Sequence, residues 1–390
     1  MKFKRIFIIV CDSLGVGEAL DASNYGDIGA NTLGHINAKH NLFVPNLEKL
    51  GFINTINASR NDKAEAYYTM ARPINKGKDT LSGHYEMMGV KCDYAFPSFT
   101  ETGFPEELIQ TIVNYTGRGV LGNIAASGTE IIKELGEEQL KTGKLIIYTS
   151  SDSVLQVASH EKVLSKEELY EICEGIRKIC NTRDEWRVGR VIARPFKGEN
   201  KDTFVRTPNR HDFAIDPPMK SVLEELKDKG YSVISVGKIY DIFNGKGITK
   251  RIVSKSNKEG VDKTLDILDK KFTGLCYINL NDFDMLYGHR RDSKGYAEAI
   301  EALDVDIPMI LNKLNNDDLL IITADHGNDP TFKGTNHTRE NVPVLIYSRI
   351  FKEKGLLPIM ETFADIGATV AENFEVEIPT IGKSYLDMLK

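Results

Sequence analysis

The chain has 390 residues, of which 41% are hydrophobic and 27% are charged, and its formal net charge is −6. These values are typical of a soluble globular protein with ample apolar material for a core, and the length allows about two or three domains. The negative net charge and the lack of a basic run with interleaved aromatic residues argue against nucleic acid as a partner.

The N-terminal segment has a basic start and a β-branched, apolar run from Ile6 to Cys11. The run ends at Asp12, so it is too short for a signal peptide or a membrane helix, and it predicts a strand buried on both faces. We therefore expect no membrane partner. The five cysteines form no Cys-x-x-Cys pair and, without an export signal, indicate a reducing, cytoplasmic location: Cys11, Cys92, Cys173, Cys180 and Cys276.

Two stretches near the N-terminus carry polar groups at the ends of predicted elements. Asp12 follows the first strand and precedes a loop rich in glycine and asparagine, where binding groups commonly lie. The stretch 78–88 has N-cap residues followed by helix formers and predicts a helix start. A Thr80 or Ser82 hydroxyl there would lie at the positive end of the helix dipole, which stabilises a phosphoryl group. Turn and cap roles are the alternatives for all three residues.

The region between Pro97 and Pro217 predicts a separate α+β domain. We expect helices at 106–112, at 130–135 and after the Ser165–Glu168 capping box, and a strand at 144–148. Arginines gather on short strand-like pieces of this region: Arg187, Arg190, Arg194, Arg206 and Arg210. Surface arginines are ordinary, but several in one short β-rich stretch suit the binding of carboxylate or phosphate.

The rest of the chain alternates strands with helices. We expect strands at 231–236, 275–280, 319–322 and 342–347, and helices at 220–229, 260–271, 300–314 and 361–373. This alternation predicts an α/β fold with a mostly parallel sheet and helices on both of its faces.

Carboxylate and imidazole side chains follow three of the predicted strands. They are Asp12 after the first strand; Asp284 and His289 after the strand at 275–280; and Asp325 and His326 after the strand at 319–322, with His337 just beyond. The ends of parallel strands converge at one edge of a sheet, and these groups suffice for two divalent metal sites. Asp325 taken alone could equally lie in a surface turn. The other histidines lack such neighbours in the sequence, and we interpret them as structural: His35, His40, His84, His160 and His211.

These stretches resemble the alkaline-phosphatase superfamily and, within it, the phosphopentomutase family. The superfamily's two-metal core combines a strand-end Asp, a Ser or Thr nucleophile at a helix N-terminus, a later Asp and His, an Asp-His-Gly and a final His. The resemblance covers essentially the whole chain and rests on residues 10–17, 78–86, 150–153, 206–212, 282–292 and 323–330. The pieces 79–84 and 288–292 separate the chain from the cofactor-independent phosphoglycerate mutases, which use a Ser nucleophile.

The resemblance implies a fold and a set of site residues. The fold is an alkaline-phosphatase-like core of residues 1–96 and 217–390, with a smaller α+β cap domain of residues 97–216 inserted into it. The resemblance also implies that Thr80 is the residue that becomes phosphorylated. Two divalent ions, most often Mn²⁺ in this family, would be bound by Asp12, Asp325 and His326 and by Asp284, His289 and His337. The ribose hydroxyls and the distal phosphate would be bound by Ser150, Asp152, Arg190, Arg206 and Lys238.

The implied reaction interconverts ribose 1-phosphate and ribose 5-phosphate, or the 2-deoxy sugars, through phospho-Thr80 and a 1,5-bisphosphate. The expected partner is therefore a small phosphosugar. The residues leave two alternatives open. A phosphatase or phosphodiesterase would use the same core and release phosphate to water, and the arginine-bearing middle domain argues against it. A metal- or sugar-phosphate-binding protein would catalyse no reaction, and the complete ligand set together with Thr80 argues against that.

Overall fold

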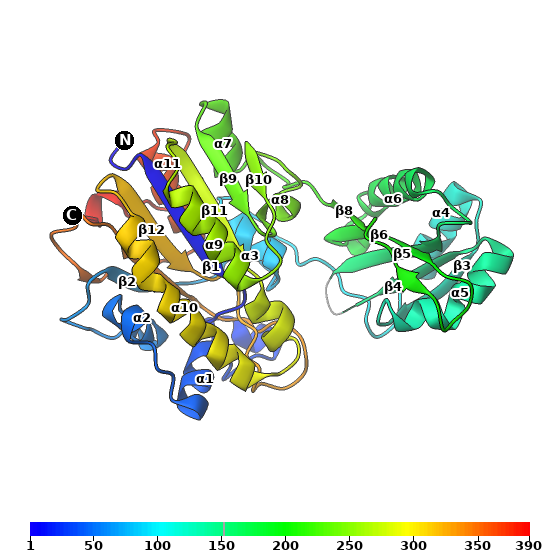
Figure 1. Cartoon of the computed structure of the whole chain (residues 1–390), viewed down its shortest axis with the longest axis horizontal. Coiled ribbons are helices and arrows are strands. Elements are labelled where there is room, and N and C mark those ends of the chain that lie inside the picture. Colours follow the sequence, from blue (N-terminus) through cyan, green and yellow to red (C-terminus); the bar gives the residue numbers. More distant parts are fainter. Residues whose placement is uncertain (151–152) are drawn as a thin grey trace. The chain divides into compact units, whose positions relative to one another are not determined.

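The chain folds into two compact units. Figure 1 shows the computed structural model, which describes residues 1–150 and 153–390. The larger unit consists of Met1–Ala95 and Pro217–Lys390, and the smaller one, Phe96–Asp216, is inserted between these two segments. Within the described ranges, every helix is too short or too polar to span a lipid bilayer.

An eight-stranded sheet with the order β10-β9-β11-β1-β12-β13-β2-β14 is the core of the larger unit. Its strands are β1 (Arg5–Cys11), β2 (Tyr67–Ala71), β9 (Ser232–Val236), β10 (Lys250–Ile252), β11 (Gly274–Leu280), β12 (Asp318–Thr323), β13 (Val342–Tyr347) and β14 (Gly355–Leu356). The first five strands of that order are parallel, whereas β13 is antiparallel to both of its neighbours. The predicted α/β class with a mostly parallel sheet is thus confirmed.

Helices cover both faces of this sheet (Figure 1). One set is α1 (Thr32–His40), α2 (Pro45–Lys49), α9 (Asn257–Leu268) and α10 (Ser293–Lys313), in which α10 contacts the other three. The other set is α3 (Thr80–Met87), α7 (Val222–Asp228), α8 (Ile239–Ile242) and α11 (Ala364–Asn373), in which α3 contacts α8 and α11. Because α3 packs on this face, its N-terminus comes to the edge where the parallel strands end.

The register of the central strands decides which residues meet at that edge. β1 lies between β11 and β12, and all three strands are fully buried, as expected for continuous apolar runs. Cys11 pairs with Leu280 of β11, and Val10 pairs with Thr323 of β12. The three strands therefore end at the same level, and the residues that follow them are brought together.

The smaller unit has its own mixed sheet with the order β3-β4-β5-β6-β7 and with β8 paired to β6. Its elements are α4 (Glu106–Thr116), β3 (Val120–Ala125), α5 (Glu130–Thr142), β4 (Leu145–Thr149), β5 (Val154–His160), α6 (Lys166–Cys180), β6 (Arg190–Lys197), β7 (Val205–Arg206) and β8 (His211–Ala214). The side chains of β4 alternate between two cores, because Leu145 and Ile147 pack with α4 and α6 while Ile146 and Tyr148 pack with α5.

Candidate active site

The carboxyl edge of the large sheet brings the six predicted metal ligands together. They are Asp12 after β1; Asp284 and His289 in and after the π-helical turn Phe283–Gly288 that follows β11; Asp325 and His326 after β12; and His337 in the next loop. All except His289 are at least nine-tenths buried. A π-helical turn is rare and is frequently found at functional sites.

Asp12, Asp325 and His326 form one group, which also contacts Thr80. The Nε2 atom of His326 lies 3.5 Å from Asp12 Oδ1, 3.5 Å from Asp325 Oδ2 and 3.2 Å from the Thr80 hydroxyl. On the other side of the ring, Nδ1 lies 3.0 Å from the backbone carbonyl oxygen of Gly327. A hydrogen bond from Nδ1–H to this carbonyl leaves the lone pair on Nε2, which is the form in which an imidazole binds a metal ion.

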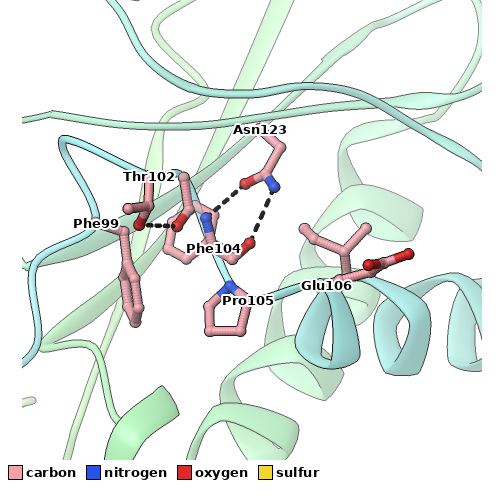
Figure 2. A pocket seen from close by; sticks show the side chains of 8 residues that line it. Phe99, Thr102, Phe104, Pro105, Glu106 and Asn123 are labelled. Carbon is pink, nitrogen blue, oxygen red and sulfur yellow. Dashed lines mark hydrogen bonds between the residues drawn. The ribbon is translucent and has the colours of Figure 1, made fainter.

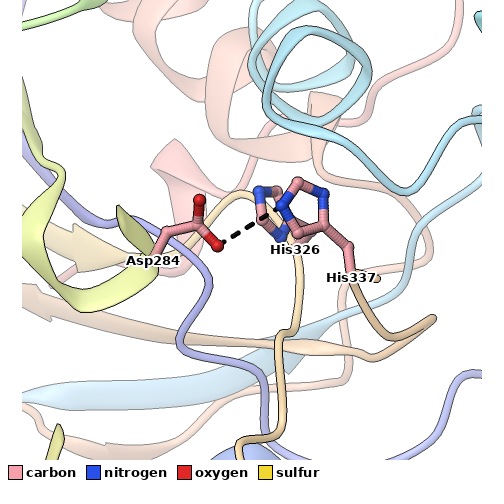
Figure 3. Close-up of side chains that lie close together, drawn as sticks. All are labelled: Asp284, His326 and His337. Carbon is pink, nitrogen blue, oxygen red and sulfur yellow. Dashed lines mark ion pairs between the residues drawn. The ribbon is translucent and has the colours of Figure 1, made fainter. Parts of the chain in front are cut away.

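Asp284, His289 and His337 form a second group. The Nε2 atom of His337 lies 3.3 Å from Asp284 Oδ1 and 3.1 Å from Nε2 of His289, which is itself 3.2 Å from Asp284 Oδ2. The rings of His326 and His337 are stacked with their centroids 4.0 Å apart, and Figure 3 shows them side by side next to Asp284. The donor atoms of Asp284, His326 and His337 lie within 4.8 Å of one another. His326 therefore stands between the two groups.

The first group fits a bound cation. Asp12 Oδ1 and Asp325 Oδ2 are buried, and neither accepts a hydrogen bond from any described residue. A buried carboxylate oxygen without a donor is unfavourable, and a divalent ion between the two oxygens would satisfy both of them. Carboxylate and imidazole donors together suit Mn²⁺, Zn²⁺ or Fe²⁺.

The pKa values of this group follow from its burial and its crowding. Burial and the neighbouring Asp12 raise the pKa of Asp325 to about 8. Burial opposes charge on His326 too, but Asp325 and Asp12 outweigh it and raise the pKa of His326 to about 10. For Asp12, burial is outweighed by the Lys238 ammonium, 3.4 Å from Oδ2, and by His326, so the pKa is lowered to about 2. A cation that binds here must therefore displace protons.

Thr80 is the first residue of α3, and its hydroxyl is the accessible one of the two at this helix start. Thr80 is half-buried, whereas Ser82 is fully buried and donates its hydroxyl to Asp79 Oδ2 at 2.8 Å. Asp79 also accepts the backbone N–H groups of Leu81 and Ser82, at 3.0 and 3.1 Å. The Asp79 cap thus already uses these two N–H groups of the helix start.

A hydrogen-bonded layer lies directly behind the first group. His84 Nδ1 is 2.6 Å from the Tyr277 hydroxyl, and His84 Nε2 is 3.5 Å from Asp325 Oδ2. Asn279 donates to Asp12 Oδ2 at 3.1 Å. Burial lowers the pKa of His84 to about 3, so this ring is neutral. The interpretation of His84 as structural, because it lacks comparable carboxylate or imidazole neighbours in the sequence, remains a prediction, but the fold places it directly behind Asp325. The sequence did carry a signal for this position: His84 follows Thr80 by four residues, so the two lie on the same face of α3.

The arginines of the smaller unit differ in their partners. Arg190 and Arg210 both contact Asp212, at 3.6 and 2.6 Å. Arg194 donates to the side chain of Gln156 at 3.0 Å. Arg206 is exposed, and its guanidinium makes no hydrogen bond or ion pair with any residue among 1–150 and 153–390. Arg194, Arg206 and Arg210 lie close enough together for their positive charges to act on one another.

Tyr148 lies at the centre of this positive charge. Its hydroxyl is buried and has no hydrogen-bond partner in the described part of the chain. Burial raises the pKa of Tyr148, and the charges of Arg194, Arg206 and Arg210 oppose that rise. Burial and the nearby Arg210 also lower the pKa of Arg194 to about 10. Crowded guanidinium groups and an unpartnered hydroxyl suit an anion such as a phosphate.

The remaining predicted substrate residues lie in different places. The Ser150 hydroxyl is 3.5 Å from Gln156, the residue that also contacts Arg194, so Ser150 borders the arginines. Asp152 lies outside the described residues. Lys238 belongs to the larger unit, where it contacts Asp12. Ser150 and Lys238 therefore belong to different units.

A separate hollow of about 500 Å³ lies at the start of α4 in the smaller unit (Figure 2). Phe99, Phe104 and Glu106 are among its lining residues, and the Asn123 side chain holds the backbone of Phe104 through bonds of 2.7 and 3.0 Å. Its described lining residues include no arginine or lysine, and Glu106 contributes a carboxylate. The hollow therefore does not suit a phosphate.

Comparison with known proteins identifies the class to which this fold and these donors belong. A family model described as the Metalloenzyme superfamily matches residues 4–378, so the chain is a member of that superfamily. Phosphopentomutases of Clostridium tetani and Clostridium beijerinckii are 53% and 52% identical to it, and each alignment covers 100% of this chain and 99% of the relative. The chain belongs to the phosphopentomutase family and is an isomerase, which confirms the resemblance seen in its sequence.

A solved structure supports the fold. The crystal structure of Leishmania mexicana phosphoglycerate mutase aligns with a TM-score of 0.51 over 98% of this chain and 97% of that chain, at 13% sequence identity. At this identity the likeness concerns the fold alone.

Proposed function

We propose that the protein interconverts ribose 1-phosphate and ribose 5-phosphate, or their 2-deoxy forms, by transferring a phosphoryl group through Thr80. The observation that carries this proposal is the position of the Thr80 hydroxyl, 3.2 Å from His326 at the edge of a group of residues able to hold a cation. A hydroxyl placed in this way suits nucleophilic attack on phosphorus. Membership of the phosphopentomutase family supports the choice of substrate.

In the proposed cycle Thr80 alternates between a hydroxyl and a phosphothreonine. The bond between phosphorus and Thr80 Oγ1 breaks, a bond to the free hydroxyl oxygen of the sugar monophosphate forms, and the proton of that hydroxyl ends on Thr80. The product is a 1,5-bisphosphate, which reorients and returns its other phosphate to Thr80. Water would hydrolyse the phosphothreonine, so it must be excluded. We assign this exclusion to Phe96–Asp216, acting as a cap over the substrate.

Two divalent ions, which we take to be Mn²⁺, belong to this proposal. One would be held by Asp12, Asp325 and His326, and the other by Asp284, His289 and His337. When bound, they would neutralise charge on the transferring group and lower the pKa of the Thr80 hydroxyl. The chain prepares the ligands with hydrogen bonds of its own, such as that from Asn328 Nδ2 to Asp284 Oδ1 at 2.8 Å.

The substrate residues of the proposal are divided between the two units. Arg206 is the best placed for the distal phosphate, because it is exposed and unpaired in the described chain, whereas Arg190 already contacts Asp212. Ser150 and Asp152 are assigned to the ribose hydroxyls. Lys238, which contacts Asp12, is assigned to the part of the substrate that lies next to Asp12.

The variant Thr80→Ala tests the nucleophile. It should retain two bound ions and bind the sugar phosphate, yet lose turnover, because no other accessible hydroxyl lies at this helix start. Ser82→Ala is the matched control, since it removes a neighbouring hydroxyl that only donates to the Asp79 cap, and it should keep most of the activity. Intact-mass and peptide mass spectrometry should locate phosphate on Thr80. Unchanged turnover in Thr80→Ala, or phosphate on Ser82, would contradict the assignment.

A product assay separates this function from that of a phosphatase, which would use the same core. The protein is incubated with ribose 5-phosphate and Mn²⁺, and ribose 1-phosphate and free phosphate are measured in the same sample. We expect ribose 1-phosphate to form much faster than free phosphate. Rapid release of phosphate without ribose 1-phosphate would rule out the mutase.

A further inference from the structure

Arg291 connects the two loops that carry the second group of ligands. Its guanidinium donates to five oxygens: the backbone carbonyls of Gly334 at 2.5 Å, Asp329 at 2.9 Å, Asn336 at 3.1 Å and Gly288 at 3.2 Å, and the side-chain oxygen of Asn328 at 2.7 Å. Arg291 and Gly288 belong to the loop of Asp284 and His289. The other four acceptors belong to the loop of His337. All five acceptors are uncharged, so this arginine fixes backbone and amide positions instead of forming an ion pair.

The acceptors of Arg291 either contact the proposed ligands Asp284 and His289 or lie next to a residue that does. The Asn328 amide accepts from Arg291 through its oxygen and donates from Nδ2 to Asp284 Oδ1 at 2.8 Å. Between Gly334 and Asn336, the carbonyl oxygen of Thr335 lies 3.1 Å from His289 Nδ1. A bond from Nδ1–H to a carbonyl fixes the ring orientation and leaves Nε2 directed at Asp284.

The backbone at this position is unfavourable for an arginine. Arg291 has φ +56°, in the left-handed region that residues with a Cβ atom rarely adopt. Such a conformation persists only where the surrounding contacts impose it. The preceding residue, Arg290, has the same charge but is exposed and forms no hydrogen bond or ion pair with the residues that the structure describes. The two adjacent arginines therefore differ in contacts and not in charge.

We propose that Arg291 is a positioning residue for the second metal site, which it assembles by holding the loop of His337 against the loop of Asp284 and His289. This inference rests on the proposed function, because it requires these three residues to be metal ligands. Lysine cannot replace Arg291 in this role, since its three donors sit on one nitrogen and cannot reach acceptors spread around a planar fork.

A titration of the full-length, metal-free protein with Mn²⁺ tests the inference. Calorimetry measures the number and affinity of bound ions, and electron paramagnetic resonance of free Mn²⁺ gives an independent count. In Arg291→Gln and Arg291→Lys, one ion should keep its affinity while the other binds about 10- to 100-fold more weakly, the usual effect of removing a group that orients a ligand. Higher Mn²⁺ should refill the weakened site. Arg290→Gln and Arg290→Lys, the matched controls, should bind both ions as the parent protein does.

His337→Ala distinguishes the possible failures, and thermal unfolding verifies that each variant is folded. If His337→Ala loses one ion while both Arg291 variants bind two with unchanged affinity, the inference about Arg291 is overturned and the ligand assignment stands. If His337→Ala also binds two ions unchanged, the ligand assignment in the proposed function is overturned together with the inference. Should Arg291→Gln not fold, Arg291→Lys, which keeps the charge, decides between the same outcomes.

Discussion

Gly83→Ala is expected to separate Thr80 from His326 and the other proposed metal ligands. A Cβ atom on Gly83 would lie 1.9 Å from the carbonyl oxygen of Asp325, about 1.5 Å closer than an ordinary van der Waals contact. That oxygen is a backbone atom just past the end of β12 and cannot rotate away, so α3 must shift and carry Thr80 from its position 3.2 Å from His326. A displacement of about 1 Å at a reacting group can cost about 100-fold in rate. We therefore expect the turnover number for ribose 5-phosphate to fall about 100-fold.

The effect of Gly83→Ala on stability should be much smaller than its effect on rate. Overpacking lowers the free energy of unfolding by about 1–3 kcal/mol, and replacing glycine with alanine inside a helix raises it by about 1 kcal/mol. Urea unfolding should therefore show a loss of at most about 2 kcal/mol. Gly119→Ala is the control, because the three atoms nearest to its Cβ would belong to the flexible stem of Lys144, the first at 3.2 Å. Turnover of Gly83→Ala within twofold of the parent protein would refute the claim that this close approach positions Thr80.

Two further predictions concern protons and a buried ion pair. Binding of Mn²⁺ at pH 7 should release protons, because the pKa values of Asp325, about 8, and of His326, about 10, both lie above that pH, and affinity should rise as the pH increases through 8. Calorimetry in buffers of different ionisation enthalpy measures this release, and a binding enthalpy independent of the buffer would contradict it. Asp318→Asn should destabilise the protein by about 3–5 kcal/mol, because the buried Arg5 donates to both of its oxygens, at 2.7 and 2.5 Å. A loss below about 1 kcal/mol in urea unfolding would refute that prediction.

The central strands could be predicted from the sequence because strands that are buried on both faces consist almost entirely of apolar residues. β1, β11 and β12 are buried on both faces and therefore read as continuous apolar runs. Helix starts were less predictable, because they depend on single contacts. A helix was expected from residue 260, but α9 begins at Asn257 because Ser256 accepts the N–H of Glu259. The two-residue strand β14 has no pattern of its own and exists through its pairing with β2.

The site was predictable to the extent that strand ends supply it. The register of β1, β11 and β12 explains why Asp12, Asp284 and Asp325 come close together. Contacts between loops, in contrast, could not be predicted from any pattern in the sequence. The approach of Asn328 to Asp284 joins residues 44 positions apart, and it requires Gly288, whose Cβ would lie 2.8 Å from the Asn328 side chain. Likewise, the spacing of the arginines does not reveal which of them has a carboxylate partner.

The segment from Asp325 to His337 connects the two groups of proposed ligands through its own backbone. Gly327 and Thr338 form an antiparallel bridge with bonds of 2.9 and 3.3 Å, so the chain leaves the site after His326 and returns to it at His337. The stacking of these two imidazoles at 4.0 Å is a consequence of that bridge. A Cβ on Gly327 would lie 2.4 Å from the buried carboxylate of Glu340, so this position also demands glycine.

The bridge and Arg291 therefore act on different parts of the same loop. The bridge fixes where His326 and His337 lie relative to each other, whereas Arg291 fixes the tip of the loop, at Gly334 and Asn336, against the turn that carries His289. Changes at the tip should leave the stacked imidazoles in place and act on His289 and Asp284. Changes at Gly327 should move both histidines and so disturb both groups. The two proposed metal sites are for this reason structurally coupled through His326 and separable through Arg291.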